Sequence, residues 1–297
     1  ENYKDIIDAL THFRKYNLDF IKLYVSLDFD IANKVLYYAK SKNFKVGAHL
    51  WSVPIEKVLE LPYHPDIIDH VATIIQRKKV ELKGYNDLAE IWADHFDEGW
   101  AEEIAEKLRV KDIGVTTTLI NLARVWGIWK DVCENLLDYV FYYNKFIRTL
   151  KYNPFFHIFR KKNVPIAEGA SYWDIDKNVN VRAWRNLVTM TKILYQKGVT
   201  LLPAADSPNT RIPPGEGFIK ELIILNKEVN IPQRELLRSS TYFAAKFTGL
   251  QKYSLGVIKE GLESNIVLLE GNPFTDINSL YKIKVIIMGN IMLRPSD

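Results

Sequence analysis

The sequence predicts an α/β fold built on a parallel sheet. Short runs rich in aliphatic and β-branched residues alternate with longer helical patterns, which is the signature of consecutive β-α-β units. The chain has 297 residues, of which 47% are hydrophobic, so it is long enough for one large α/β domain or for a domain with an appendage. After residue 206 the alternation stops, and two later runs predict a separate small sheet.

The strands of the parallel sheet are expected at residues 20–26, 45–51, 66–72, 114–121 and 199–206. A helix over residues 28–41 follows the first run, because its apolar residues recur with the 3.6-residue period of a helix. Ser52 and Pro54 mark the start of a short helix after the second run, and a longer helical region reaches about residue 108. Residues 122–180 are dense in aromatic side chains, which fits a helix core or, as the alternative, a lid over a substrate.

The C-terminal part opens with a Pro-Pro-Gly turn at residues 213–215 and continues as two helices. The first ends near Lys227, and Pro232 opens the second, which stops at Gly249 because glycine readily ends a helix. The small sheet is expected at residues 265–270 and 282–288, on either side of the turn GNPFTD.

Composition excludes several classes of function. Lys and Arg number 40 against 36 Asp and Glu, without a dense basic block, so we expect no nucleic acid partner. The only cysteine is Cys133, so neither an intrachain disulfide nor a cysteine zinc cluster can form. No apolar run approaches the roughly 18–20 residues of a membrane helix, so we expect no membrane partner. The chain begins without Met, in an amphipathic helical pattern, so we expect it to be processed or truncated, and its compartment stays open.

Side chains suited to metal chemistry stand at or near the ends of four predicted strands, namely Lys22, His49, His70 and Asp206. Parallel α/β barrels place their catalytic groups at the carboxyl ends of the strands. Two histidines on neighbouring strands can bind one ion, and Asp206 can bind it while accepting a proton from water. Structural alternatives remain: Lys22 can pair with an acid, either histidine can be a hydrogen-bonded core residue, and Asp206 can open a turn.

The ordered runs resemble the amidohydrolase superfamily, in particular its imidazolonepropionase-like and Xaa-Pro-dipeptidase-like branch. DFIKLYVS is similar to the fourth barrel strand of that family, KVGAHLW to the fifth, DIIDHVA to the sixth, GVTTTL to the seventh and GVTLLPAAD to the eighth. The tail from PPGEGF to FTDI follows the family's two helices and closing signature. Thr117 stands where Pro is commoner, Ala204-Ala205 replace the usual Gly-Thr, and residues 264–266 replace Ala-Asp-Leu.

The resemblance implies a metal-dependent hydrolase of C–N bonds. One or two divalent ions, zinc first, would be held by His49, His70 and Asp206, with Lys22 bridging them if it is carboxylated. Asp206 would be the general base, and His70 would bind metal or polarise the substrate carbonyl. The substrate would be a small molecule or short peptide with an amide, cyclic amide or peptide bond.

The resemblance also gives a domain organisation. Residues 1–255 would form strands 4 to 8 of a TIM-type (β/α)8 barrel, and residues 256–297 would be the C-terminal part of a composite β-sandwich. The family's first strand ends in His-x-His, and no such pair occurs in these 297 residues. We therefore expect a missing N-terminal segment or a companion chain to supply the rest of the barrel, and a homo-oligomer stays open.

Two functions other than hydrolysis compete with this reading. The absence of the His pair favours a catalytically inactive scaffold that binds a ligand or partner, whereas the retention of four candidate residues disfavours it. A non-hydrolytic enzyme on the same barrel ranks third, because a fold alone does not fix a reaction.

Overall fold

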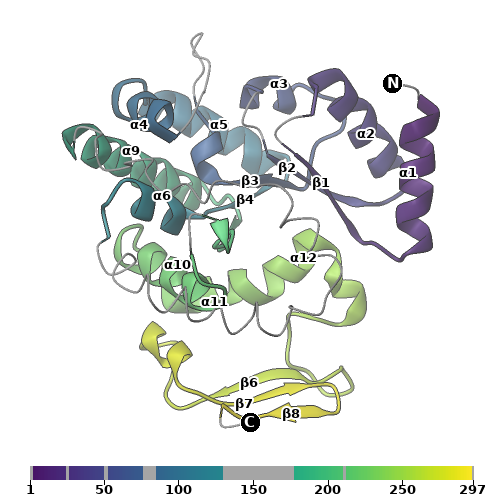
Figure 1. Ribbon diagram of the computed structural model, residues 1–297, viewed down its shortest axis with the longest axis vertical. Helices are drawn as coiled ribbons and strands as arrows, with labels where there is room; N and C mark the ends of the chain where they lie inside the picture. The colour runs from purple at the N-terminus through teal and green to yellow at the C-terminus, as the bar shows by residue number, and fades with distance from the viewer. Residues whose placement is uncertain are drawn as a thin grey trace, which may run out of the picture.

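A parallel sheet forms the centre of the molecule (Figure 1). The computed structural model describes residues 3–24, 27–49, 53–75, 85–129, 177–209 and 212–295. Its five strands follow chain order and every neighbouring pair is parallel. The strands are β1 (Phe20–Leu23), β2 (Lys45–His49), β3 (Ile67–Asp69), β4 (Gly114–Thr116) and β5 (Leu201–Leu202). Each lies inside one of the five predicted runs, so the predicted α/β class is confirmed.

The strands are shorter than the runs that predicted them, and in the third and fourth runs the chain turns before the run ends. After β3, Val71–Thr73 forms a 3-10 turn, and after β4 the helix α6 (Leu119–Val125) begins within the run predicted as strand. The expectation of a strand as far as residue 121 was therefore wrong. Val71, Leu119 and Ile120 are nevertheless fully buried. An apolar run in the sequence therefore predicts which residues are buried. It does not predict where the strand ends, because that depends on where the chain turns within the run.

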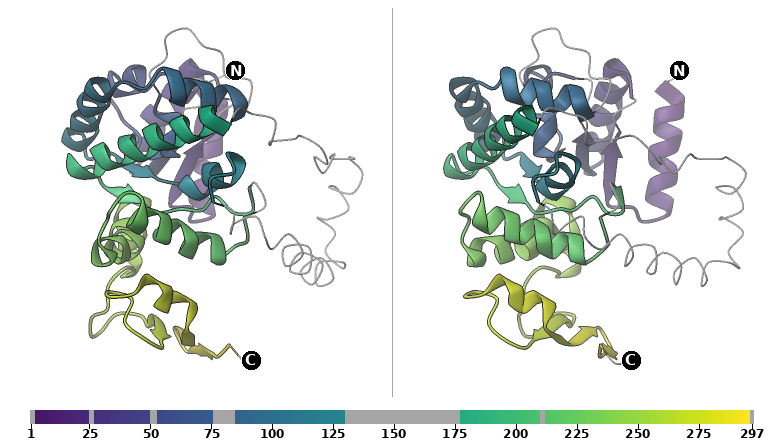
Figure 2. Two further views of the ribbon diagram at one scale, coloured as in Figure 1. Left: turned by 90° about the vertical axis from the view of Figure 1, so that its left-hand side faces the viewer. Right: turned by 60° about the vertical axis from the view of Figure 1, so that its left-hand side comes forward.

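Helices lie on both sides of the parallel sheet (Figures 1 and 2). The first group is α1 (Tyr3–Lys15), α2 (Phe29–Ser41), α3 (Ile55–Leu59), α4 (Tyr85–Asp94), α5 (Glu98–Val110) and α9 (Lys177–Gln196). Next come α10 (Glu216–Lys227), α11 (Gln233–Arg238) and α12 (Ala244–Thr248). Phe247 of α12 packs against Ile67 and Leu202, so α12 covers the sheet face opposite the first group. Of the aromatic segment predicted at 122–180, residues 130–176 lie outside the described residues.

Local signals explain where the helices begin and end. Asp28 accepts hydrogen bonds from the backbone N–H groups of Asp30 (2.9 Å) and Ile31 (3.3 Å), which caps α2. Pro54 is the N-cap of α3, one place before the first turn where the sequence predicted it, and Ser52 lies outside the described residues. Gly249 ends α12 with φ 80°, a conformation that glycine adopts without steric cost.

The C-terminal residues form a separate three-stranded antiparallel sheet (Figure 1). Its strands are β6 (Asn265–Leu269), β7 (Ile283–Met288) and β8 (Ile291–Leu293). The first two were predicted, whereas the third was missed because a three-residue strand carries no periodic signal. Described residues 256–295 contain only this one sheet, so the second layer of the expected β-sandwich is not confirmed.

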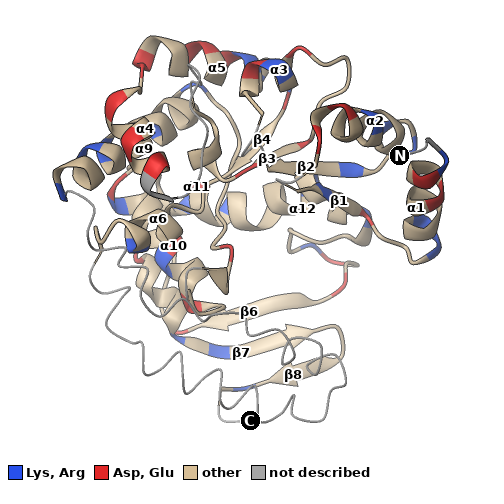
Figure 3. Cartoon of the chain, turned by 45° about the horizontal axis from the view of Figure 1, so that its top comes forward, with Lys and Arg blue, Asp and Glu red and all other residues tan. Residues whose placement is uncertain are grey.

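Charges are spread over the outer helices with both signs interspersed, which agrees with the absence of a basic block in the sequence (Figure 3). In the part of the chain that the structure describes, no helix is both long and apolar enough to cross a membrane.

Candidate active site

Three of the four predicted site residues meet at the carboxyl edge of the parallel sheet. His49 is the last residue of β2, His70 directly follows β3, and Asp206 lies just beyond β5. The ring centroids of His49 and His70 are 4.6 Å apart in an edge-to-face arrangement. The Nε2 atom of His70 lies 3.9 Å from Oδ2 of Asp206. Parallel strands in register explain this convergence, because their carboxyl ends share one edge.

Lys22 lies in the same region but pairs with an acid that the sequence reading missed. Its Nζ is 3.1 Å from Oδ2 of Asp69, the last residue of β3. The register partner of Lys22 on the intervening strand β2 is Gly47, where an added Cβ would lie 2.6 Å from the ring of Phe20 and 3.8 Å from Oδ2 of Asp69. This ion pair belongs to the ammonium form of Lys22, since a carboxylated lysine would place a second negative charge beside Asp69. The signal for Asp69 in the sequence was its place before His70 at the end of an apolar run.

Two threonines at the end of β4, Thr116 and Thr118, hold His70 from the neighbouring strand. The backbone N–H of His70 donates to Oγ1 of Thr116 at 2.7 Å, and Nδ1 of His70 lies 3.0 Å from Oγ1 of Thr118. Thr116 donates in turn to Oδ1 of Asp69 at 3.2 Å. The ring of His70 is thus fixed through Nδ1, which leaves Nε2 facing Asp206.

The backbone is in the left-handed region where three strands end at this site. His70, Thr118 and Asp206 have φ values of 61°, 51° and 50°. Such a conformation is unfavourable for a residue with a side chain, and most of all for a β-branched one, so surrounding contacts must hold it. At Asp206 the contact is Asn209, whose Nδ2 donates to Oδ2 at 2.9 Å.

Burial sets the protonation state of both histidines. It lowers the pKa of His49 to about 4, with the positive charges of His70 and Lys22 acting in the same direction. Burial also lowers the pKa of His70, although the nearby carboxylates of Asp69 and Asp206 oppose this. Both imidazoles are therefore neutral at neutral pH, which is the state that can bind a metal ion or accept a proton.

The donor atoms suit a zinc-type ion in kind but not in number. Imidazole nitrogens and a carboxylate are ligands that zinc takes, and the Nδ1 contact of His70 is the support that a ligating histidine usually has. Within the described ranges, however, no group of three His, Cys, Asp or Glu side chains is close enough to hold an ion. The metal therefore stays a prediction, and it needs ligands beyond those that converge here.

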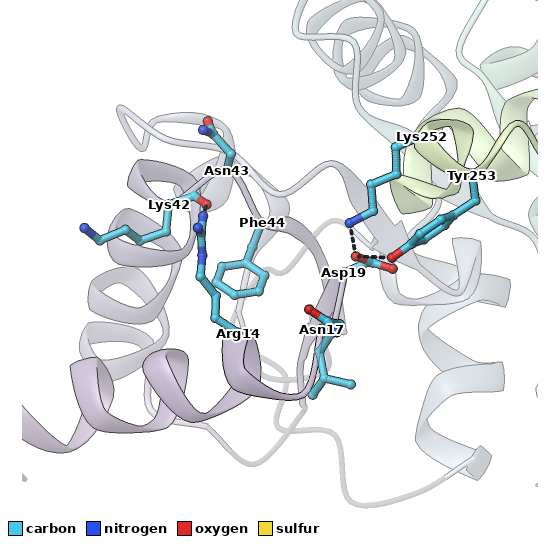
Figure 4. A pocket seen from close by; sticks show the side chains of 9 residues that line it. Arg14, Asn17, Asp19, Lys42, Asn43, Phe44, Lys252 and Tyr253 are labelled. Carbon is cyan, nitrogen blue, oxygen red and sulfur yellow. Dashed lines mark hydrogen bonds and ion pairs between the residues drawn. The ribbon is translucent and has the colours of Figure 1, made fainter.

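A cavity of about 280 Å³ lies at the opposite, amino ends of β1 and β2 (Figure 4). Two of its positive groups, Arg14 and Lys252, are engaged locally. Arg14 donates to the carbonyl oxygen of Lys42, past the C-terminus of α2, and its guanidinium lies over the ring of Phe44. Lys252 pairs with Asp19. We interpret this cavity as structural, because Arg14 binds a carbonyl oxygen at the end of α2 and Lys252 pairs with Asp19, the residue before β1.

Comparison with solved structures shows what this architecture is. Bottromycin amidohydrolase superposes with a TM-score of 0.67 at 14% sequence identity, over 100% of this chain and 60% of its own. A Xaa-Pro dipeptidase with methionine bound in its active site gives 0.59 at 15%, over 99% and 59%. The ochratoxinase of A. niger gives 0.59 at 15%, over 99% and 55%. The chain shares its fold with these amidohydrolase and dipeptidase structures over nearly its whole length.

The resemblance to amidohydrolases was predicted from the sequence runs, and the structural comparison confirms it at the level of the fold. No model of a known protein family matches the chain, and no curated protein sequence matches it. At these low identities the structural likeness establishes the fold alone. The chain spans about 60% of the length of the neighbours that it matches.

Proposed function

We propose that this chain is the C-terminal part of a hydrolase that cleaves C–N bonds of the amide, cyclic amide or peptide type. The observation that carries the proposal is the convergence of His49, His70 and Asp206 at the carboxyl edge of a parallel sheet with an amidohydrolase fold. That edge is where barrel enzymes place their chemistry. The named neighbours, a dipeptidase and amidohydrolases, support this class of bond.

Asp206 is the proposed general base. Its side chain is partly exposed and faces Nε2 of His70, so a water molecule can reach both groups. In the proposed reaction Asp206 takes a proton from the attacking water and passes it to the leaving nitrogen. His70, held neutral by its burial, orients the attacking water from the other side.

A divalent ion, with zinc as the first candidate, would be held by His49, His70 and Asp206 together with ligands from outside the described residues. Such an ion would polarise the substrate carbonyl and lower the pKa of water. A carboxylated Lys22 would bridge a second ion only if the pair that it makes with Asp69 were broken.

The same proposal extends to the whole protein. Residues 1–255 would supply strands 4 to 8 of an eight-stranded barrel, and residues 256–297 part of a β-sandwich. An N-terminal segment or companion chain would supply the remainder. This is supported by β1 and β5, each of which has one strand partner among the described residues, and by the exposed apolar side chains of β6–β8.

The alternative is an inactive scaffold that keeps the fold to bind a ligand or partner. The Lys22–Asp69 ion pair and the lack of a three-ligand cluster among the described residues favour it.

Metal content and hydrolysis, measured on the same samples, separate the two functions. The chain is produced alone and with the segment encoded upstream of Glu1, then tested for zinc by plasma mass spectrometry and for cleavage of N-acyl amino acids and Xaa-Pro dipeptides. We expect near-stoichiometric metal and activity with the upstream segment. Asp206→Asn should lower kcat about 10²- to 10⁴-fold, whereas Asp8→Asn, on the exposed face of α1, should not. An absence of metal and of turnover in every preparation would favour the scaffold.

A further inference from the structure

The turn between β4 and α6 is built around a buried acid. The side chain of Glu221, on α10, is fully buried. Its carboxylate accepts hydrogen bonds from Oγ1 of Thr117 (2.5 Å), from the backbone N–H of Leu119 (3.0 Å) and from the backbone N–H of Ile120 (2.7 Å). Because one side chain binds Thr117, Leu119 and Ile120 at once, it fixes the backbone of the turn.

Thr118 lies in the middle of this turn with φ 51° and ψ 32°, a conformation that is costly for a β-branched residue. The contacts of Glu221 on both sides of Thr118 hold the backbone there. In this conformation the hydroxyl of Thr118 reaches the ring of His70, at 3.0 Å from Nδ1. Thr118, the residue with the unfavourable backbone conformation, is therefore the residue of this turn that contacts His70.

The single hydroxyl proton of Thr118 determines which group donates in the hydrogen bond between Thr118 and His70. A hydroxyl has one proton, and Thr118 donates it to the carbonyl oxygen of Thr117 at 2.8 Å. Its oxygen can therefore only accept from Nδ1 of His70. A neutral His70 must then carry its proton on Nδ1 and a lone pair on Nε2, the atom that faces Asp206.

We propose that Thr118 is a positioning residue that selects the Nδ1–H tautomer of His70, and that Glu221 holds the turn from which it does so. With its lone pair on Nε2, His70 can bind an ion or accept a proton opposite Asp206. The tautomer itself depends only on the contacts above. Its catalytic meaning rests on the proposed hydrolase function.

The test reads the tautomer directly by nitrogen NMR of the full chain labelled with 15N-histidine, at about pH 8, where an ordinary imidazole is neutral. A chelator is present so that no bound ion dictates the tautomer. The chain has six histidines, and the spectrum of His70→Gln assigns the signals of His70. Because neither metal nor substrate is needed, the result is independent of whether the chain is a hydrolase.

We expect protonated Nδ1 and unprotonated Nε2 in the wild-type chain and in Thr118→Ser, which keeps the hydroxyl. Thr118→Val keeps the branched shape but removes the acceptor, so the Nε2–H form should rise about tenfold relative to the wild type. The signals of the other histidines report whether each variant folds. Protonated Nε2 in the wild-type chain overturns the proposal without any variant, and so does an unchanged tautomer in folded Thr118→Val.

Discussion

At the scale of single residues, Glu221 shows how burial and hydrogen bonding oppose each other. Burial raises the pKa of its carboxyl from an ordinary value of 4.5 to about 7, although the three hydrogen bonds to Thr117, Leu119 and Ile120 lower it in part. Burial is the larger effect because the side chain has no access to water. The ionised form is thus disfavoured in the folded chain.

This raised pKa predicts a pH-dependent stability. The contribution of the protonated form is complete below about pH 4.5 and is lost as the pH rises through about 7. The free energy of unfolding should fall by on the order of 3 kcal/mol over that window because of this group alone. Urea unfolding of the wild type and Glu221→Gln across pH 4 to 8 measures it, because glutamine does not titrate.

The matched control is Glu228→Gln at the C-terminal end of the same helix, a side chain that is only half-buried. It should follow the wild-type pH profile. Parallel profiles for the wild type and Glu221→Gln would mean that the three hydrogen bonds fully offset burial, so that the pKa of Glu221 is the same in the folded and the unfolded chain.

The site residues that the sequence predicted are those whose chemistry is visible in one run. His49, His70 and Asp206 could be predicted because each stands at or beyond the carboxyl end of a strand. Asp69 and Thr118 could not be assigned roles, since their partners come from other strands. Glu221 is separated from Thr117 by 104 positions, and no local pattern links them.

At the scale of elements, the amino ends of the strands are tied by Asp66. Its carboxylate lies 2.8 Å from Nζ of Lys40 on α2 and 2.8 Å from Nζ of Lys45 on β2, and it accepts from the backbone N–H of Val46 at 2.9 Å. Asp66 is nearly buried while both lysines are partly exposed. This single side chain connects α2, β2 and the start of β3.

We expect Asp66→Asn to lower the free energy of unfolding by about 1–3 kcal/mol, because a buried charge-assisted network loses its charge. Asp112→Asn is the matched control. Asp112 pairs with Lys246 at 2.9 Å but is largely exposed, so its removal should cost about 0–1 kcal/mol. Equal losses in the two variants, measured by urea denaturation, would contradict the distinction between a buried and an exposed ion pair.

Element order was predictable and element ends were not. The alternation of β-rich runs with helical patterns gave the parallel sheet in the right order. The end of β4 depends on the Thr116–Thr118 turn, which Glu221 fixes from a distant helix. The third strand of the small sheet, β8, has only three residues, too few for an alternating pattern.

At the scale of the whole molecule, the C-terminal sheet is notable because it exposes apolar side chains on both of its faces. Cross-strand pairing places Val267 opposite Ile286 and Leu293 on one face, and Ile266 opposite Ile287 and Met292 on the other. Val267, Met292 and Leu293 are about half exposed. A sheet with apolar side chains on both faces normally has a layer against each, so we expect each face of β6–β8 to be an interaction surface.

This surface predicts that the chain alone binds a hydrophobic dye at β6–β8. Val267→Lys combined with Met292→Lys places a charge on each face and should lower the dye fluorescence several-fold. Val110→Lys, on α5, is the control because Val110 is 68% exposed but isolated, and single exposed apolar residues do not form dye sites. If a companion segment completes the sandwich, its addition should lower the dye signal of the wild type to that of the double variant. Dye binding that survives the double substitution would instead place the exposed apolar surface elsewhere, with the open edges of the parallel sheet as the next surface to test.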